Sequence, residues 1–200
     1  MSKISLIGLS SCATGGKDTL YLILEKLLEK HGIKTERFAL ADILKVEVAP
    51  YIKEQYNLSV FTKDIKEKTL IRGILVEHGR IKRTITHGRY FIDLIDKKVK
   101  ESISNGILPI LTDIRYATHH DDEVGWLKSN NGLLIHIERI LSDGQLIGPA
   151  NADESENDPK IKQIADYHLK WPTTDNIHIR EDCVKLQLKD LLERIISENN

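Results

Sequence analysis

Two adjacent glycines and a lysine follow the first apolar run of the chain, in a pattern that could bind phosphate. Residues 4–9 are mostly apolar, and the segment SSCATGGK at residues 10–17 comes directly after them. Small residues let main-chain N–H groups approach phosphate oxygens, and the amino end of the following helix adds positive potential. Lys17 would neutralise the outer phosphates of a nucleoside triphosphate such as ATP. The residues expected to bind these phosphates are Ser11, Thr14, Gly15, Gly16 and Lys17.

This segment departs twice from the phosphate-loop pattern G-x-x-x-x-G-K-[ST]. Ser11 stands at the first glycine position and Asp18 at the hydroxyl position. A carboxylate repels a polyphosphate unless a cation intervenes. Asp18 would therefore help to hold Mg²⁺ or turn away as an acid in the first helical turn, with Thr19 as the neighbouring hydroxyl. A flexible turn with no ligand remains the alternative for the whole segment.

A second polar group follows the apolar run at residues 107–111. Asp113 could hold Mg²⁺ through water, orient an acceptor oxygen, or fix Arg115 by an ion pair; we favour metal or acceptor contact. Arg139 follows another apolar run, at residues 133–137, and could stack on an adenine or reach the phosphates, with a surface arginine as the plain alternative.

Phosphoryl transfer requires alignment and charge neutralisation, so several cations should converge. Arg80 and Arg83 end a predicted helix, and guanidinium groups pair well with phosphate, although cations at a helix end are also favourable without any ligand. Asp42 and Lys45 share one helix face and could hold a nucleoside or remain exposed charges. The residues expected to act in catalysis are Lys17, Asp113, Arg115, Arg80 and Arg83.

Alternating strands and helices are expected to position these groups. Apolar runs predict strands, and 3.6-residue periodicity predicts helices between them, which favours an α/β fold with a parallel sheet of about five strands flanked by helices. The polar groups would then gather at the carboxyl ends of the strands, as in a P-loop NTPase. Residues 1–200 form one domain, in which residues 142–159 are a lid or simply a long loop. Strands are expected at residues 4–9, 35–40, 107–111, 133–137 and 167–169, and helices at 18–31, 42–56, 63–83, 90–105, 121–129 and 183–196.

The composition gives little global attraction for large anionic partners. The chain has 29 basic and 30 acidic residues, a formal net charge of -1, so we expect no nucleic acid and no membrane as partners. Two distant cysteines and the lack of a signal peptide or spanning segment indicate a cytoplasmic protein. Small-molecule nucleotides are the expected partners, and a homodimer stays open.

The order of motifs resembles the deoxynucleoside monophosphate kinases of bacteriophages. The segments that carry the resemblance are GKDT at residues 16–19, FALADILK at 38–45, HGR at 78–80 and TDIRY at 112–116. It implies transfer of the γ-phosphoryl group of ATP to a (deoxy)nucleoside 5′-monophosphate with Mg²⁺. It further implies metal contacts by Asp18, Thr19 and Asp113, nucleotide contact by Arg139, and acceptor contacts by Asp42, Lys45, Arg72, Arg80, Arg115 and Glu123. Ser11 and the sequence KWP at 170–172 depart from the family pattern.

Two other functions remain as alternatives. Animal phosphomevalonate kinases share the Gly-Lys-Asp style of loop, so the acceptor could be another small phosphorylated molecule. A nucleotide-binding protein without turnover would also keep this loop. Asp113, Arg115, Arg80 and Arg83 favour the kinases, since a binding protein needs no second phosphate site.

Overall fold

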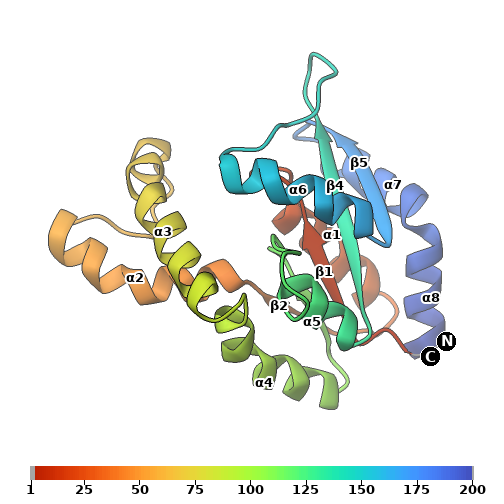
Figure 1. Ribbon diagram of the computed structural model, residues 1–200. Helices are drawn as coiled ribbons and strands as arrows, with labels where there is room; N and C mark the ends of the chain where they lie inside the picture. The colour runs from red at the N-terminus through yellow and green to blue at the C-terminus, as the bar shows by residue number, and fades with distance from the viewer. Residues whose placement is uncertain (1–2, 200) are drawn as a thin grey trace.

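The centre of the fold is a five-stranded sheet in which every neighbouring pair of strands is parallel (Figure 1). The computed structural model describes residues 3–199. The strand order is β2-β3-β1-β4-β5, so the first strand lies in the middle, and all strands end at one edge. The strands are β1 (Leu6–Ser10), β2 (Thr35–Phe38), β3 (Leu108–Leu111), β4 (Gly132–Ile140) and β5 (Tyr167–Pro172).

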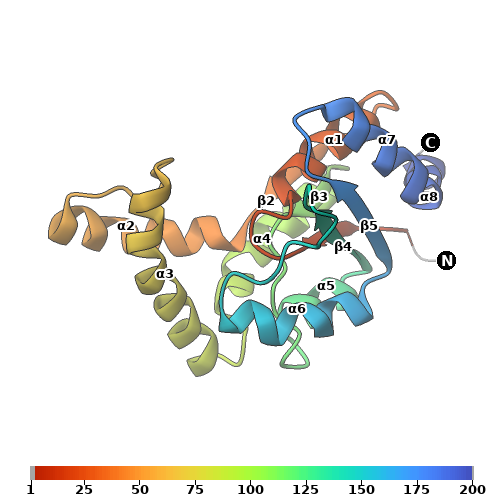
Figure 2. The ribbon, with the colours of Figure 1, turned by 90° about the horizontal axis from the view of Figure 1, so that it is seen from above.

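Helices cover both faces of the sheet, as parallel strands require (Figure 2). Side chains alternate along β1: Ile7 and Leu9 pack on one face, and Leu6 packs on the other. The first face is covered by α1 (Lys17–Glu29), α7 (Ile177–Gln187) and α8 (Lys189–Asn199), and the opposite face by α4 (Tyr90–Ser104), α5 (Glu123–Ser129) and α6 (Ala152–Ile164).

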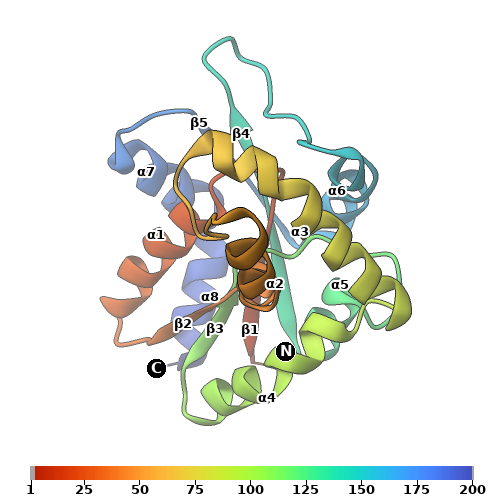
Figure 3. The ribbon, with the colours of Figure 1, turned by 90° about the vertical axis from the view of Figure 1, so that its left-hand side faces the viewer.

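Helices α2 (Leu40–Tyr56) and α3 (Ile65–Ile85) form an arm that stands away from the sheet (Figure 1) and lies in front of the strands when the molecule is seen from that side (Figure 3). The arm has its own small core, in which Val48 and Ile52 of α2 meet Val60 and Ile71. Gly79 lets the two helices approach, because a Cβ there would lie 2.9 Å from the Leu44 side chain.

The expected α/β fold with five parallel strands and flanking helices is confirmed, with two corrections. The stretch at residues 142–159 is not loop throughout, because α6 begins at Ala152 after Asn151, whose side chain accepts the N–H of Glu154 at 2.9 Å. The single helix expected at residues 183–196 is two helices that meet at Leu188. Within residues 3–199, no helix combines the length and apolar character needed to cross a membrane.

Candidate functional site

The connection between β1 and α1, residues 11–16 and here called the glycine loop, is shaped by its two glycines. Gly16 has a φ of +104°, and a Cβ there would lie 2.5 Å from the Trp171 ring. A Cβ on Gly15 would lie 2.4 Å from Ser11 Oγ, and the Gly15 carbonyl accepts a hydrogen bond from Trp171 Nε1 at 3.0 Å. Neither position accepts a side chain without rearrangement, so the glycines fix a tight turn.

Ser11 does not disturb this turn. Among the described residues with positive φ, the glycine loop contributes Thr14, at +63°, and Gly16, but not Ser11. Replacing the usual glycine by serine at this position therefore causes no backbone strain, because Ser11 does not need a positive φ.

Lys17, the first residue of α1, folds back over the glycine loop. Its Nζ donates to the Ser11 carbonyl at 2.9 Å, to Ser11 Oγ at 3.0 Å and to the Cys12 carbonyl at 3.3 Å. Its side chain is buried, and burial, reinforced by the nearby Arg115 cation, lowers the pKa of Lys17 to about 8. The pKa of Lys17 still lies above neutral pH, so the side chain stays mostly charged there, and an anion beside Nζ would stabilise that charge.

Asp18 turns away from the glycine loop. Its carboxylate is largely exposed and pairs with Arg37 at 2.9 Å; Arg37 also pairs with Asp42 at 2.9 Å, and Asp42 contacts Lys45 Nζ at 3.2 Å. These four side chains form one surface network. Asp18 thus takes the second of its two expected positions, as a first-turn acid with an ion pair.

Asp113 holds the start of the arm. Its Oδ1 accepts the N–H of Leu40 at 2.9 Å and its Oδ2 accepts that of Ala41 at 2.6 Å, so the buried carboxylate binds the first amides of α2. The ion pair with Arg115 that was one of its expected roles is not formed in the described chain, where Arg115 pairs with Glu154. Asp113 therefore has a clear structural task beside any contact with a ligand.

The residues expected to hold Mg²⁺ are not gathered into a metal site. In residues 3–199 no group of three or more His, Cys, Asp or Glu side chains is placed to hold a metal ion. Thr19 accepts a long hydrogen bond from Arg180 at 3.5 Å. Asp18 is paired with Arg37, and Asp113 is bound to two main-chain amides. Their oxygens therefore do not form a cation site unless phosphate oxygens supply further ligands.

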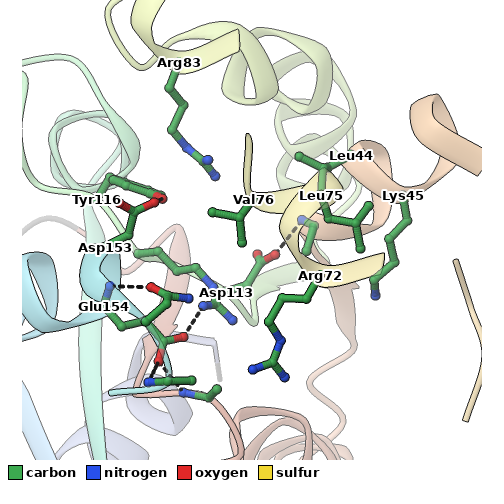
Figure 4. A pocket seen from close by; sticks show the side chains of 15 residues that line it. Leu44, Lys45, Arg72, Leu75, Val76, Arg83, Asp113, Tyr116, Asp153 and Glu154 are labelled. Carbon is green, nitrogen blue, oxygen red and sulfur yellow. Dashed lines mark hydrogen bonds and ion pairs between the residues drawn. The ribbon is translucent and has the colours of Figure 1, made fainter. Parts of the chain in front are cut away.

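A cavity of about 280 Å³ opens between the arm and the strand ends (Figure 4). Ala13 of the glycine loop belongs to its wall, so the loop and the cavity are continuous. Figure 4 shows Arg72 and Lys45 on one side of the cavity and Asp153 and Glu154 on the other. The cationic side chains of the wall are Lys45, Arg72, Arg83 and Arg115, and its apolar members include Ala41, Leu44, Leu75 and Val76.

The two expected arginines of α3 differ in position. Arg83 lines the cavity, and its guanidinium carbon lies 4.0 Å from the Tyr116 ring centroid. Arg80 pairs with Glu77 on the exposed side of the same helix and is not part of the described cavity wall. Arg72 lies about two helical turns before Arg80 in α3 and lines the cavity. Among residues 3–199, no carboxylate pairs with it.

Glu123 lies beneath the site instead of in it. The carboxylate is 1% exposed; Oε2 accepts the N–H groups of Arg115 and Tyr116 at 2.6 and 3.2 Å, and Oε1 pairs with Arg83 at 3.3 Å. Burial raises the pKa of Glu123 to about 7. The residue expected to touch the acceptor therefore positions two arginines that line the cavity.

Glu154 is the site residue that sequence reasoning missed. Its carboxylate joins Arg115, at 2.5 Å, to the N–H of Ala13, at 3.1 Å, across the mouth of the glycine loop. The spacing of Asn151 and Glu154, which matches a capping box at a helix start, was the available signal. It was hidden by the Gly, Asn, Asp and Pro residues around it, which indicate loop.

Arg139 lies on the outer side of the glycine loop. Its Nη1 donates to the Thr14 carbonyl at 2.9 Å and its Nε donates to Thr173 Oγ1 at 2.8 Å. In the described part of the chain it makes no ion pair with a carboxylate. Its charge is therefore available beside the loop.

No family model matches the chain, and no curated protein sequence matches it. A solved structure titled TT1252 from Thermus thermophilus is similar at 15% identity and a TM-score of 0.45, covering 95% of this chain and 99% of that chain. At these values the similarity carries no argument about function.

Proposed function

We propose that the protein is a P-loop kinase that transfers the γ-phosphoryl group of ATP to a (deoxy)nucleoside 5′-monophosphate. The proposal is carried by the continuity of two features with groups suited to phosphate. The first is the glycine loop with Lys17, and the second is the cavity lined by Arg72, Arg83 and Arg115; Ala13 of the loop belongs to the cavity wall. A phosphotransferase must bring two phosphates together, one from the donor and one from the acceptor.

The donor phosphates bind the glycine loop. Their negative charge draws Lys17 from the Ser11 carbonyl, where a desolvated cation has only neutral partners, towards the outer phosphates. Arg139, bound to the Thr14 carbonyl on the outer side, neutralises charge there or stacks on the base. Mg²⁺ would enter with the nucleotide and be held by phosphate oxygens and water, because Asp18 pairs with Arg37 and Asp113 binds the amides of Leu40 and Ala41.

The acceptor binds the cavity. Its phosphate meets the guanidinium groups of Arg72 and Arg115, and its remaining atoms pack on the apolar wall formed by Leu44, Leu75 and Val76. Lys45 of the cavity wall binds the polar edge of the acceptor, and Asp42 contacts its Nζ at 3.2 Å. The arm of α2 and α3 is fastened to the sheet by Asp113, so closure of the arm would move these groups together.

The same wall supports a second acceptor class. Leu44, Leu75 and Val76 offer no hydrogen-bonding group for a base, so a small phosphorylated molecule with an aliphatic body would also pack there. This alternative keeps the donor, the reaction and the arginines and changes only the acceptor. A nucleotide-binding protein without turnover is less favoured, since it has no use for the cationic cavity.

The experiment is ADP release from Mg·ATP measured with each common nucleoside and deoxynucleoside monophosphate, and with an aliphatic phosphomonoester. Stimulation by one monophosphate, lost in Lys17→Ala and kept in Lys30→Ala, is the expected result. Lys30 is an exposed lysine at the other end of α1 and serves as the matched control. Binding of ATP with no stimulation by any phosphorylated acceptor would refute the proposal.

A further inference from the structure

The carboxylate of Glu154 is bound by three donors from three separate segments. Oε2 accepts the N–H of Ala13 at 3.1 Å and that of Ala150 at 2.9 Å, and Oε1 accepts Arg115 Nη1 at 2.5 Å. We call this set of contacts the Glu154 bridge. It joins the glycine loop, the end of the connection before α6, and the segment after β3 that carries Arg115 of the cavity wall.

The surroundings of Glu154 suit an anion. Only 8% of the residue is exposed. Burial alone would raise its pKa, but the N–H groups of Ala150 and Ala13 and the Arg115 cation outweigh burial, so the pKa of Glu154 lies below its ordinary value. A pair of main-chain amides and a guanidinium is also the donor set that recognises phosphate oxygens.

The Glu154 bridge occupies hydrogen-bond donors that phosphate binding would require. The amide of Ala13 belongs to the glycine loop and faces the junction with the cavity, and Arg115 is a cation of the cavity wall. Lys17 is satisfied in the same way by the Ser11 carbonyl. In this state the main anion-binding groups at the junction are already occupied by atoms of the protein itself.

From these contacts we propose that Glu154 is an internal competitor of the phosphoryl group, occupying the anion site between the glycine loop and the cavity until nucleotide displaces it. The inference rests on the proposed function. Displacement frees Arg115 to meet the incoming phosphates and releases the first turn of α6, which is tied to the loop through Glu154. Substrate binding and rearrangement of this turn are then one event.

The competitor role makes a prediction that a fixed positioning role does not. Removing the charge at Glu154 leaves Ala13 and Arg115 without their anion, so phosphate binds without first displacing one. Glu154→Gln should therefore bind Mg·ATP and inorganic tripolyphosphate about tenfold more tightly than the wild type. If Glu154 only orients Arg115, the same variant binds equally or more weakly.

Titration calorimetry of wild type, Glu154→Gln and Glu156→Gln tests this. Glu156 is an exposed carboxylate on the same helix, paired with Lys160, and its variant should bind like the wild type. Tighter binding by Glu154→Gln alone supports the inference; equal or weaker binding overturns it. If the wild type binds Mg·ATP and turns over while Glu154→Gln binds no tighter, only the competitor role fails. If no variant binds Mg·ATP, the proposed function fails as well.

A measurement on the unmodified protein keeps the test decisive if Glu154→Gln does not fold. The carbonyl-carbon NMR signal of the Glu154 side chain should shift when Mg·ATP saturates the wild type, because the carboxylate leaves Ala13 and Arg115. The Glu156 signal should stay in place. A Glu154 signal that does not move on saturation contradicts the inference.

Discussion

The main-chain N–H of Arg115 donates to the buried carboxylate of Glu123 at 2.6 Å. The guanidinium of the same arginine lies in the cavity wall and pairs with Glu154. One residue is thus fixed at its backbone by α5 and engaged at its tip by α6. Since Glu123 also pairs with Arg83, a single carboxylate positions two cations of the cavity.

Glu123 should give the fold a distinct pH dependence. Its pKa is about 7 in the folded protein and 4.5 ordinarily, so between these values the folded chain retains a proton that the unfolded chain has lost. Its contribution to the free energy of unfolding is therefore full below about pH 4.5 and falls by a few kcal/mol by about pH 7, at about 1.4 kcal/mol per pKa unit. Glu123→Gln removes this fall. Urea unfolding of the wild type and Glu123→Gln between about pH 4.5 and pH 7 measures this difference. If the free energies of unfolding of the two proteins change with pH in parallel, Glu123 does not titrate in this range.

Lys17 should take up a proton when nucleotide binds. In the free protein its pKa is about 8, against an ordinary 10.5, and a polyphosphate beside Nζ stabilises the charged form. Between these two pH values, the heat of Mg·ATP binding should therefore depend on the ionisation enthalpy of the buffer. Lys17→Arg, which does not titrate in this range, should abolish the dependence. Equal proton uptake by this variant would assign the proton to another group.

Arg72 and Arg80 lie on the same helix and should differ in function. Arg72 extends into the cavity, whereas Arg80 pairs with Glu77 on the exposed face. Arg72→Ala should raise the KM for the acceptor about tenfold, from the loss of one guanidinium-phosphate contact, and Arg80→Ala should leave it unchanged. Steady-state kinetics with the best acceptor measure both. A larger effect at Arg80 would mean that the arm rotates on closure.

Gly16 and Gly73 differ in whether the structure leaves room for an added methyl group. Gly16→Ala places a side chain at a φ of +104° and against Trp171, and should lower the free energy of unfolding by about 1–3 kcal/mol and weaken Mg·ATP binding. Gly73 lies inside α3 with nothing within 4 Å of its missing Cβ. Gly73→Ala should stabilise the protein by about 0.5–1 kcal/mol. Urea unfolding and calorimetry test both, and a neutral Gly16→Ala would contradict the account of the loop.

The sheet and the position of the candidate site could be predicted because both depend on local patterns. Apolar runs marked the five strands, and the parallel order brought Lys17, Asp113 and Arg115 to one edge. The whole of α6 was missed, because the turn-forming residues at 142–159 indicate loop and Pro159 lies inside the helix. The local composition indicates loop, whereas the helix is stabilised by packing of Ile161 into the core.

The partners of individual side chains were not predictable. Asp113 binds amides at Leu40 and Ala41, and Glu123 binds amides at Arg115 and Tyr116. Both carboxylates are engaged by main-chain groups whose positions depend on how distant segments pack. A sequence pattern gives the residue type but not the donor that it meets, which is why Glu123 was expected in contact with the acceptor.

Transfer of label from γ-radiolabelled ATP to an acceptor tests the central claim most directly. The account predicts a labelled diphosphate product when wild-type protein, Mg²⁺, labelled ATP and one (deoxy)nucleoside monophosphate are combined, and none with Lys17→Ala. Label found only in inorganic phosphate, or retained in ATP with every phosphorylated acceptor, would contradict the claim that the glycine loop and the cationic cavity serve one reaction.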